Sequence, residues 1–395
     1  MKRSFSSSED GLDTLLVTAS RGDASVAGAI NVPLQRASTI RFPTYGDLVE
    51  ARTDPVRNIS YGIYGTSTVK AFEEAMAQLE GGYGARAVGT GLAAISAAIC
   101  SLVRTGDHIL VVDSAYGPVR RLCDYLSDAM HVEVTYYSPG AEADVAGLLR
   151  ENSRAILAES PGSQTMEVQD IRLLCSIAKQ RSIPVIVDNT WATPVLFNPI
   201  SHGADIVIHA ATKYICGYSD VILGVVVSTE EYYDVINRYA NMMGMYAGPD
   251  DCYTALRGLR SMAARLARHD ASALSIARWL DEQAQVVKVL HPALPGSAGH
   301  ALWARDFRGS SGLFSFILDP RYAREDVERF VDGLRLFSIG ASWGGFESLV
   351  LPAFPYPKRS VSSPLAEGTL IRLHIGLENP EDLQLDLEKG LALLG

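Results

Sequence analysis

The sequence predicts an α/β protein with a mostly parallel central sheet and a second, smaller sheet toward its carboxyl end. Two observations predict this fold class. Short apolar runs rich in β-branched residues recur between residues 108 and 227, and helix-like stretches separate them. Continuous apolar runs alternating with helices are typical of parallel strands buried on both faces. The length of 395 residues also suits two domains rather than one.

The first part of the chain has weak periodicity. Residues 1–60 contain three prolines and are expected to form an extended arm with a short helix, packed against a neighbouring subunit. The segment FEEAMAQL (Phe72–Leu79) has helical spacing, and Gly81-Gly82 is a suitable stop for that helix.

A regular alternation of strands and helices follows. Ile171–Gln180 is representative of the expected helices. The runs expected as strands are His108–Val112, Val132–Tyr136, Ala155–Ala158, Pro184–Val187, Ile206–Ile208 and Val221–Val227.

The alternation loosens after Arg257. Met262–Gln285 is expected to be a long amphipathic helix, and Gly312–Leu318 and Thr369–Ile375 are expected strands of the second sheet. With the boundary placed near Leu256, residues 61–256 form the expected cofactor-binding domain and residues 257–395 the carboxyl-terminal domain.

The charge balance and the apolar runs exclude several classes of protein. A net charge of −10 argues against nucleic-acid binding, which needs clustered Lys and Arg. No apolar run approaches the roughly 20 residues of a membrane helix, and no apolar segment follows the charged start of the chain as in a secretory signal. A cytoplasmic location is therefore expected.

The cysteine and histidine spacing favours neither disulfides nor a metal site. The five cysteines are dispersed without a C-x-x-C pair, which favours buried free thiols. His202 and His209 lack the carboxylate–histidine spacing of a metal site, so no metal is expected.

Two polar residues follow buried strands in the middle of the chain. Asp188 ends the run PVIVD, and Lys213 follows the run DIVIHA with small residues before it. A desolvated lysine has a lowered pKa, as Schiff-base chemistry requires. Pyridoxal 5'-phosphate needs both groups, a lysine on its aldehyde carbon and an anion facing its ring nitrogen. Taken one at a time, a helix-capping aspartate and a surface lysine are the commoner explanations.

A glycine-containing helix start is a candidate phosphate site. Thr90-Gly91-Leu92-Ala93 follows a glycine-rich stretch and opens an expected helix, where backbone N–H groups and the helix dipole favour an anion. Any tight helix start has this pattern, so it is evidence for a phosphate site only in combination with the other candidate residues. Tyr116 follows the strand ILVVD, where its ring either stacks on a cofactor ring or packs as an ordinary core or surface tyrosine.

One arginine lies inside an apolar run. Arg372 interrupts TLIRLHI, and a charge there requires an anion. This anion is either a substrate α-carboxylate, held by two hydrogen bonds, or an acidic side chain in a structural salt bridge. The sequence favours the two explanations equally.

Taken together, these residues and the surrounding motifs resemble the Cys/Met-metabolism family of pyridoxal-phosphate enzymes. The resemblance runs through nearly the whole chain. The motifs that carry it are YGIYGT (61–66), LEGGYGA (79–85), ESPGSQTMEV (159–168), VDNTWATPVLF (187–197), ATKYICGYSD (211–220), HPALPGSAGH (291–300), GSSGLFSF (309–316), SWGGFESL (342–349) and GTLIRLHIGLE (368–378).

The resemblance implies an aspartate-aminotransferase-like fold (fold type I) and roles around the cofactor pyridoxal 5'-phosphate. Lys213 would form the Schiff base and act as the catalytic base, Asp188 would pair with the ring nitrogen, and Tyr116 would stack on the ring and assist catalysis. The residues implied to hold the phosphate are Gly91, Leu92 and Thr212.

The resemblance also implies the substrate contacts and the assembly. Arg372 would bind the substrate carboxylate, with Ser342 and Trp343 beside it. Tyr61 is similar to a catalytic, cofactor-binding tyrosine that the neighbouring subunit contributes. The implied assembly is therefore a dimer at least, and usually a homotetramer made of two dimers.

Two positions depart from the family pattern. Family members commonly carry an arginine that reaches the phosphate two residues after the active-site tyrosine, and this chain has Ile63 there. Asn241 stands where β-lyases tend to carry a tyrosine near the substrate, so Asn241 is also a candidate substrate contact. Both departures bear on specificity and on cofactor affinity more than on the reaction class.

The ESPGSQTMEV and SWGGFES strings favour the carbon–sulfur β-lyase branch of the family. The substrate would be an amino-acid thioether, most simply L-cystathionine, cleaved to homocysteine, pyruvate and ammonia. A lyase for other cysteine S-conjugates or cystine, and a γ-elimination, γ-replacement or cyclisation enzyme, stay open as alternatives. A non-catalytic protein that binds pyridoxal phosphate is a further alternative.

Overall fold

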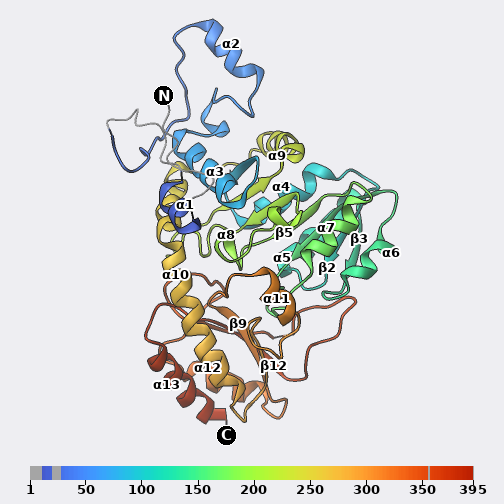
Figure 1. Cartoon of the computed structure of the whole chain (residues 1–395), viewed down its shortest axis with the longest axis vertical. Coiled ribbons are helices and arrows are strands. Elements are labelled where there is room, and N and C mark those ends of the chain that lie inside the picture. The colour runs from blue at the N-terminus through green and yellow to red at the C-terminus, as the bar shows by residue number, and fades with distance from the viewer. Residues whose placement is uncertain (1–10, 20–27, 355, 395) are drawn as a thin grey trace.

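The computed structural model describes residues 11–19, 28–354 and 356–394, and its strands form two sheets (Figure 1). The strands of the first sheet are β1 (Gly84–Val88), β2 (His108–Val112), β3 (Glu133–Tyr137), β4 (Ser153–Glu159), β5 (Val185–Asp188), β6 (Ile206–His209) and β7 (Gly224–Ser228). The strands of the second sheet are β8 (Val286–Leu290), β9 (Leu313–Leu318), β10 (Ser338–Ile339), β11 (Leu349–Pro352) and β12 (Thr369–His374).

Helices precede, connect and follow these strands. They are α1 (Leu12–Thr18), α2 (Tyr45–Thr53), α3 (Ser67–Glu80), α4 (Gly91–Leu102), α5 (Gly117–Met130), α6 (Val145–Leu148), α7 (Ile171–Lys179), α8 (Thr193–Leu196), α9 (Glu230–Met242), α10 (Pro249–Asp281), α11 (His300–Asp306), α12 (Arg324–Asp332) and α13 (Pro380–Leu391).

The first sheet has the order β1-β7-β6-β5-β4-β2-β3. The strands from β6 to β3 are parallel, and β7 runs antiparallel to both of its neighbours. Every residue of β2, β6 and β7 is buried, which explains their continuous apolar sequences. The parallel strands bring their carboxyl ends to one edge of the sheet, where ligands bind in such folds.

The second sheet has the order β10-β11-β12-β9-β8 and is largely antiparallel. Its buried core includes Phe314, Phe316 and Phe330. In Figure 1, α10 runs from the first sheet along one side of the molecule to the second, and α12 and α13 lie beside the second sheet.

The described part of the predicted arm includes α2, which lies apart from both sheets at the end of the molecule opposite the carboxyl terminus (Figure 1). Thr44 and Asp47 cap this helix reciprocally, and none of its residues is buried. Tyr45 is 80% exposed and Val49 is 46% exposed. The first residues of the predicted arm, 1–10 and 20–27, lie outside the described residues.

The expected strands agree closely with the structure, and the main differences have local causes. The long helix begins at Pro249 rather than Met262, because Cys252, Leu256 and Leu259 extend its buried face toward the amino end. The proposed boundary near Leu256 therefore falls inside α10. The strand expected from Val221 begins at Gly224, because Leu223 bonds instead to Thr212.

Within residues 11–19, 28–354 and 356–394, no helix, α10 included, combines the length and the apolar character that spanning a membrane requires.

Candidate active site

A cavity of about 340 Å³ lies where the carboxyl ends of the parallel strands face the second sheet. Side chains of both sheets line it, so neither sheet alone forms the site. Among the residues singled out from the sequence, those that line the cavity are Gly91, Leu92, Tyr116, Asp188, Thr212, Lys213, Trp343 and Arg372.

Lys213 lies in a turn after β6 and extends toward the loop before β11. Its Nζ donates to Ser342 Oγ at 2.7 Å and lies 5.1 Å from the centre of the Trp343 ring. Burial, assisted by the nearby charge of Arg372, lowers the pKa of Lys213 to about 8. At pH 7 the amine is still mostly protonated, but its neutral fraction is far larger than that of an ordinary lysine, and this neutral form can act as a nucleophile or base.

Gly344 allows this approach between the two sheets. It adopts a φ of +84°, and an added Cβ would lie 2.9 Å from the backbone of Lys213 and Tyr214. A larger residue would push the Ser342–Gly344 segment away from Lys213. The glycine in SWGG is thus explained by the close packing of the lysine turn.

Arg372 lies on β12 and is 8% exposed. One guanidinium nitrogen, Nη2, donates to the carbonyl oxygens of Gly340, Ala341 and Ser342 at 3.0–3.2 Å. Burial lowers the pKa of Arg372 to about 10, so it stays charged at neutral pH.

The sequence left open a structural salt bridge as the explanation for Arg372. The structure shows none, because Arg372 forms no ion pair with any carboxylate in residues 11–19, 28–354 or 356–394. A buried arginine that faces a cavity without a carboxylate partner is suited to binding a substrate carboxylate.

Two partly buried carboxylates lie side by side at the sheet edge. Asp188 at the end of β5 pairs in register with Glu159 at the end of β4. Burial raises the pKa of Asp188, opposed by hydrogen bonds from the Thr190 hydroxyl (2.5 Å) and backbone N–H (3.0 Å) and by His209. Burial and the neighbouring Asp188 raise the pKa of Glu159 as well.

Glu159 was not singled out from the sequence as a site residue. It accepts a hydrogen bond from the Tyr116 backbone N–H at 2.7 Å and so fixes the start of α5. The signal was present, because Glu159 follows the expected strand Ala155–Ala158 as Asp188 follows its own strand. Thr190 and Arg121 also line the cavity and were missed.

The amino end of α4 forms the candidate phosphate site. Thr90 caps the helix by accepting from Ala93 N–H at 2.9 Å, and an added Cβ on Gly91 would lie 2.6 Å from Ala210 Cβ. The backbone N–H groups of the first turn are thus exposed at close range. Thr212 lines the same cavity, although its hydroxyl already exchanges hydrogen bonds with the Leu223 backbone.

Three independent observations indicate that these groups fit pyridoxal phosphate. The amine of Lys213 is buried and its pKa is lowered. A helix amino end too close-packed for a Cβ at Gly91 suits a phosphate. The pKa of Asp188 is raised by burial, and a cationic ring nitrogen facing it would restore its ionised form.

Tyr61 and Asn241 do not line this cavity in the same chain. Tyr61 is 51% exposed and lines a separate hollow with Ile63 and Tyr246. The Asn241 amide donates to the Pro55 carbonyl at 3.4 Å, within the base of the arm. Both residues therefore face away from their own Lys213.

A sequence model of the family described as "Cys/Met metabolism PLP-dependent enzyme" matches residues 13–392. "Cystathionine beta-lyase MetC" of Escherichia coli (strain K12) is 41% identical over 394 residues, covering 96% of this chain and 98% of its own.

Relatives with other printed activities are also similar. "L-alanine/L-glutamate racemase" of Wolbachia pipientis wMel is 37% identical over 396 residues, covering 97% of each chain. Among solved structures, cystathionine gamma synthase from Xanthomonas oryzae pv. oryzae in complex with aminoacrylate and cysteine has a TM-score of 0.87 and 33% identity, covering 98% of this chain and 99% of that one.

These similarities confirm three predictions at the level of the family. The aspartate-aminotransferase-like fold, the cofactor pyridoxal 5'-phosphate and the class of pyridoxal-phosphate-dependent carbon–sulfur lyases are all supported. The match over residues 13–392 and the 41% identity over nearly the full length show that this chain belongs to the Cys/Met-metabolism family of pyridoxal-phosphate-dependent enzymes.

Proposed function

We propose that this enzyme is a carbon–sulfur β-lyase that cleaves L-cystathionine to homocysteine, pyruvate and ammonia. The observation that carries the proposal is that Lys213 and Arg372 line the same cavity. The pKa of Lys213 is lowered to about 8, and Arg372 has no carboxylate partner among the described residues. Identity of 41% to a β-lyase against 33% to a γ-synthase favours β-cleavage.

The proposed substrate orientation follows from the two cations. Arg372 binds the α-carboxylate of the amino acid, because its Nη2 is anchored by three carbonyls and its charge has no carboxylate partner among the described residues. With the carboxylate fixed there, the substrate amine and Cα lie toward Lys213. This orientation places the Cα–H bond for removal by the lysine.

The reaction then requires proton transfers that Lys213 can make. In its neutral form, Lys213 removes the Cα proton, and the hydrogen bond to Ser342 positions its Nζ. Bound pyridoxal phosphate supplies the electron sink for the negative charge at Cα. As the Cβ–S bond breaks, Lys213 returns its proton to the departing sulfur, and the remaining fragment is hydrolysed to pyruvate and ammonia.

Asp188 and Tyr116 have supporting roles in this proposal. The Asp188 carboxylate, which accepts hydrogen bonds from Thr190, would hold the ring nitrogen of bound pyridoxal phosphate in its protonated form. Tyr116 is half exposed at the cavity wall and is fixed by Glu159, so its ring can stack on the cofactor. Gly91, Leu92 and Thr212 are the proposed phosphate contacts.

The subunit arrangement is part of the same proposal. Because Tyr61 and Asn241 face away from their own Lys213, we infer that the arm carries Tyr61 to the cavity of a neighbouring subunit. The exposed Tyr45 and Val49 of α2 give that arm an apolar surface to bury. The proposed assembly is a homotetramer of two such dimers.

A γ-elimination or γ-replacement enzyme is the second candidate. Ile63 and Asn241 differ from the expected arginine and tyrosine. Ile63 follows Tyr61 beside the arm that is proposed to reach the neighbouring cavity, and Asn241, on α9, contacts Pro55 at the base of that arm. Both changes affect substrate choice, whereas Lys213, Asp188 and Arg372 would serve either reaction.

The test is a substrate panel with the holoenzyme. L-cystathionine, L-cystine, S-alkyl-L-cysteines, O-acetyl-L-homoserine and L-alanine are compared for release of pyruvate and thiol and for change of chirality. Pyruvate with equimolar thiol, fastest from L-cystathionine, is the expected result. Turnover confined to O-acetyl-L-homoserine or to alanine racemisation would overturn the β-lyase proposal.

The panel also separates an enzyme from a cofactor-binding protein. The Lys213→Ala variant is expected to lose pyruvate release by several orders of magnitude, because both proton transfers depend on this amine. A protein whose wild type binds pyridoxal phosphate but turns over no substrate of the panel would be non-catalytic.

A further inference from the structure

A second hollow of about 270 Å³ opens beside the active-site cavity. The two spaces share three lining residues, Arg121, Ser163 and Gln164, so they lie next to each other on either side of these residues. The second hollow is bounded further by the start of α5 and by Lys358 and Arg359 of the loop between β11 and β12. A substrate longer than a simple amino acid would extend from the cavity into this space.

Hydrogen bonds and an ion pair to a single carboxylate hold one wall of the hollow in place. Asp113, at the end of β2, accepts hydrogen bonds from the backbone N–H groups of Ser360, Val361 and Ser362 at 2.8–3.0 Å and from the Ser362 hydroxyl at 2.6 Å. Arg120 forms an ion pair with the same carboxylate. The loop 356–365 is therefore attached firmly to the first sheet.

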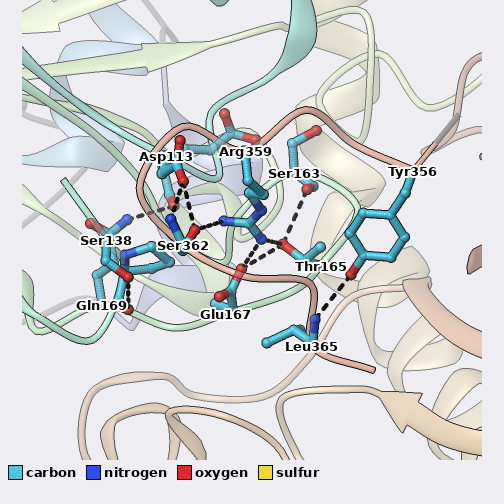
Figure 2. Close-up of polar contacts among 12 residues, drawn as sticks. Asp113, Ser138, Ser163, Thr165, Glu167, Gln169, Tyr356, Arg359, Ser362 and Leu365 are labelled. Atoms are coloured by element: carbon cyan, nitrogen blue, oxygen red, sulfur yellow. Dashed lines mark hydrogen bonds and ion pairs between the residues drawn. The ribbon is translucent and has the colours of Figure 1, made fainter. Parts of the chain in front are cut away.

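A second contact fixes the same loop to the segment that carries Ser163 and Gln164. Figure 2 shows Arg359 extending from the loop toward Thr165 and Glu167. The guanidinium donates to Thr165 Oγ1 at 2.7 Å and forms an ion pair with Glu167. Arg120 and Arg359 thus have their charges matched by buried acids, and neither is available to a ligand.

Two other cations of the hollow have no such partner. Arg121 and Lys358 are exposed, and neither takes part in a hydrogen bond or ion pair with any residue that the structure describes. The opposing charge is Asp124, also exposed and unpaired within the same part of the chain. The unpaired groups therefore carry a net positive charge.

Gln164 gives an independent indication of a polar ligand. It lines both spaces, and its Oε1 is buried without a hydrogen-bond partner among the described residues. A buried amide oxygen without a partner is unfavourable unless a ligand or water satisfies it. The second hollow is thus lined by both an unpaired cation and an unsatisfied amide.

We propose that this hollow binds the far end of the leaving thiol, and that Arg121 selects thioethers whose tail ends in a carboxylate. The inference rests on the proposed β-lyase function and names its substrate class. With the α-carboxylate at Arg372, the tail of the substrate leaves the cavity past Tyr116 and meets Arg121, the unpaired cation that lines both spaces. Lys358 lies further out and adds to the attraction.

The first test compares three tails of similar size on the wild-type holoenzyme. S-(2-carboxyethyl)-L-cysteine ends in a carboxylate, S-(2-carbamoylethyl)-L-cysteine in the neutral amide, and S-(2-aminoethyl)-L-cysteine in an ammonium group. All three release pyruvate by the same step. The expected order of kcat/KM is carboxylate, then amide, then amine, with the differences mainly in KM.

The second test changes the charge of Arg121. Arg121→Gln is expected to lower kcat/KM for the carboxylate tail roughly 10- to 100-fold, the loss of one charge-assisted hydrogen bond, and to leave the amide tail nearly unchanged. Arg121→Glu is expected to invert the order, so that the amine tail becomes the best substrate. A folding defect cannot produce that gain.

Two controls accompany these variants. Arg181→Gln makes the same change of charge at an exposed arginine just before β5, at the opposite edge of the sheet, and is expected to leave all three tails unaffected. Calorimetric binding of L-2-aminopimelate and L-lysine, the sulfur-free analogues of the carboxylate and amine tails, gives the same preference without turnover.

The outcomes separate this inference from the function on which it rests. Pyruvate release with no preference among the tails, or an Arg121→Gln effect equal for all three, would overturn the subsite and leave the β-lyase proposal intact. No pyruvate from any tail or from L-cystathionine would overturn both.

Discussion

At the scale of single residues, Lys213 is controlled by two neighbours with different effects. Burial disfavours its charged form, and Arg372 repels a second positive charge, so the pKa falls from 10.5 to about 8. The hydroxyl of Ser342 accepts from the amine and directs it. The lysine is therefore reactive before any substrate enters.

This lowered pKa predicts the pH dependence of cofactor capture. Only the neutral amine attacks an aldehyde, so the rate at which apoprotein takes up pyridoxal phosphate should rise with pH and level off above about pH 8. Arg372→Met removes the repelling charge and should move the midpoint upward. Stopped-flow absorbance between pH 6.5 and 10 measures both, and a wild-type rate still rising at pH 10 would contradict the environment described for Lys213.

Some site residues could be predicted from the sequence only as a set, and others could not be predicted at all. Asp188, Lys213 and Arg372 each had an ordinary structural explanation, but together they met the requirement that a charge within or just after a buried strand has a partner. Glu159 followed the same rule and was overlooked. The positions of Tyr61 and Asn241 could not be predicted from local pattern, because their surroundings depend on the arm and on the assembly.

At the scale of elements, the amino end of α4 depends on the absence of a side chain at Gly91. The helix packs on β6 and β7, and its first turn lies against Ala210, which leads into the lysine turn. A Cβ at Gly91 would meet Ala210 Cβ at 2.6 Å, well inside van der Waals contact. Helix, phosphate site and lysine turn are thus packed as one unit.

Gly91→Ala should therefore weaken cofactor binding. Separation of α4 from the lysine turn is expected to raise the dissociation constant for pyridoxal phosphate at least tenfold and to destabilise the fold by roughly 1–3 kcal/mol. Gly147→Ala is the matched control, since Gly147 lies on α6 with nothing within 4 Å of its added Cβ. Equilibrium titration of both apoproteins measures the effect, and equal affinities would refute the packing argument.

The loop 356–365 depends similarly on Asp113. Burial opposes ionisation of this carboxyl, but hydrogen bonds from the Ser362 hydroxyl and the backbone of residues 360–362 outweigh it and lower the pKa to about 2. The resulting stability is fully present above the unfolded pKa of 3.8 and is lost as the pH falls through about 2.

Asp113→Asn should release this loop. At pH 7 the variant is expected to lose about 2 kcal/mol of unfolding free energy and to become sensitive to trypsin at Lys358 and Arg359. Denaturant unfolding at several pH values should show the difference from wild type shrinking between pH 5 and pH 2. A constant difference over that range, with unchanged tryptic cleavage, would count against the role of Asp113.

Most elements could be predicted from the sequence because their burial is uniform. His108–Val112 is a strand with the expected bounds, since every residue in it is buried. The start of α10 was missed although signals for it were present: Pro249 at the first position, and Asp250 and Asp251 in the first turn, are typical of a helix start. The attachment of loop 356–365 pairs residues about 250 positions apart in sequence, which no local pattern reveals.

At the scale of the whole molecule, the site is divided between two sheets. Lys213 and Asp188 come from the first sheet, and Arg372 and Ser342 come from the second sheet and its loops. The relative placement of the sheets thus sets the distance between Lys213, the proposed base, and Arg372, the proposed carboxylate-binding group. The arm with α2 extends beyond both sheets (Figure 1). Tyr61 lines a hollow separate from the cavity of its own Lys213.

Mixing of two inactive variants tests whether subunits share a site. Tyr61→Phe and Lys213→Ala should each lose most activity alone. If Tyr61 serves the neighbouring cavity, hybrid dimers have one intact site out of two, and an equal mixture should recover roughly a quarter of wild-type activity. The measurement is pyruvate release after the subunits are exchanged in mild denaturant, and no recovery in verified hybrids would place Tyr61 in its own subunit's site.

The central claim, that this site breaks the bond between Cβ and sulfur, is tested most directly by the keto acid formed from L-cystathionine. Cleavage on the β side gives pyruvate and homocysteine, whereas cleavage on the γ side gives 2-oxobutyrate and cysteine. We expect pyruvate and homocysteine in equal amounts from the wild type and neither from Lys213→Ala. Predominant 2-oxobutyrate and cysteine from the wild type would contradict the assignment.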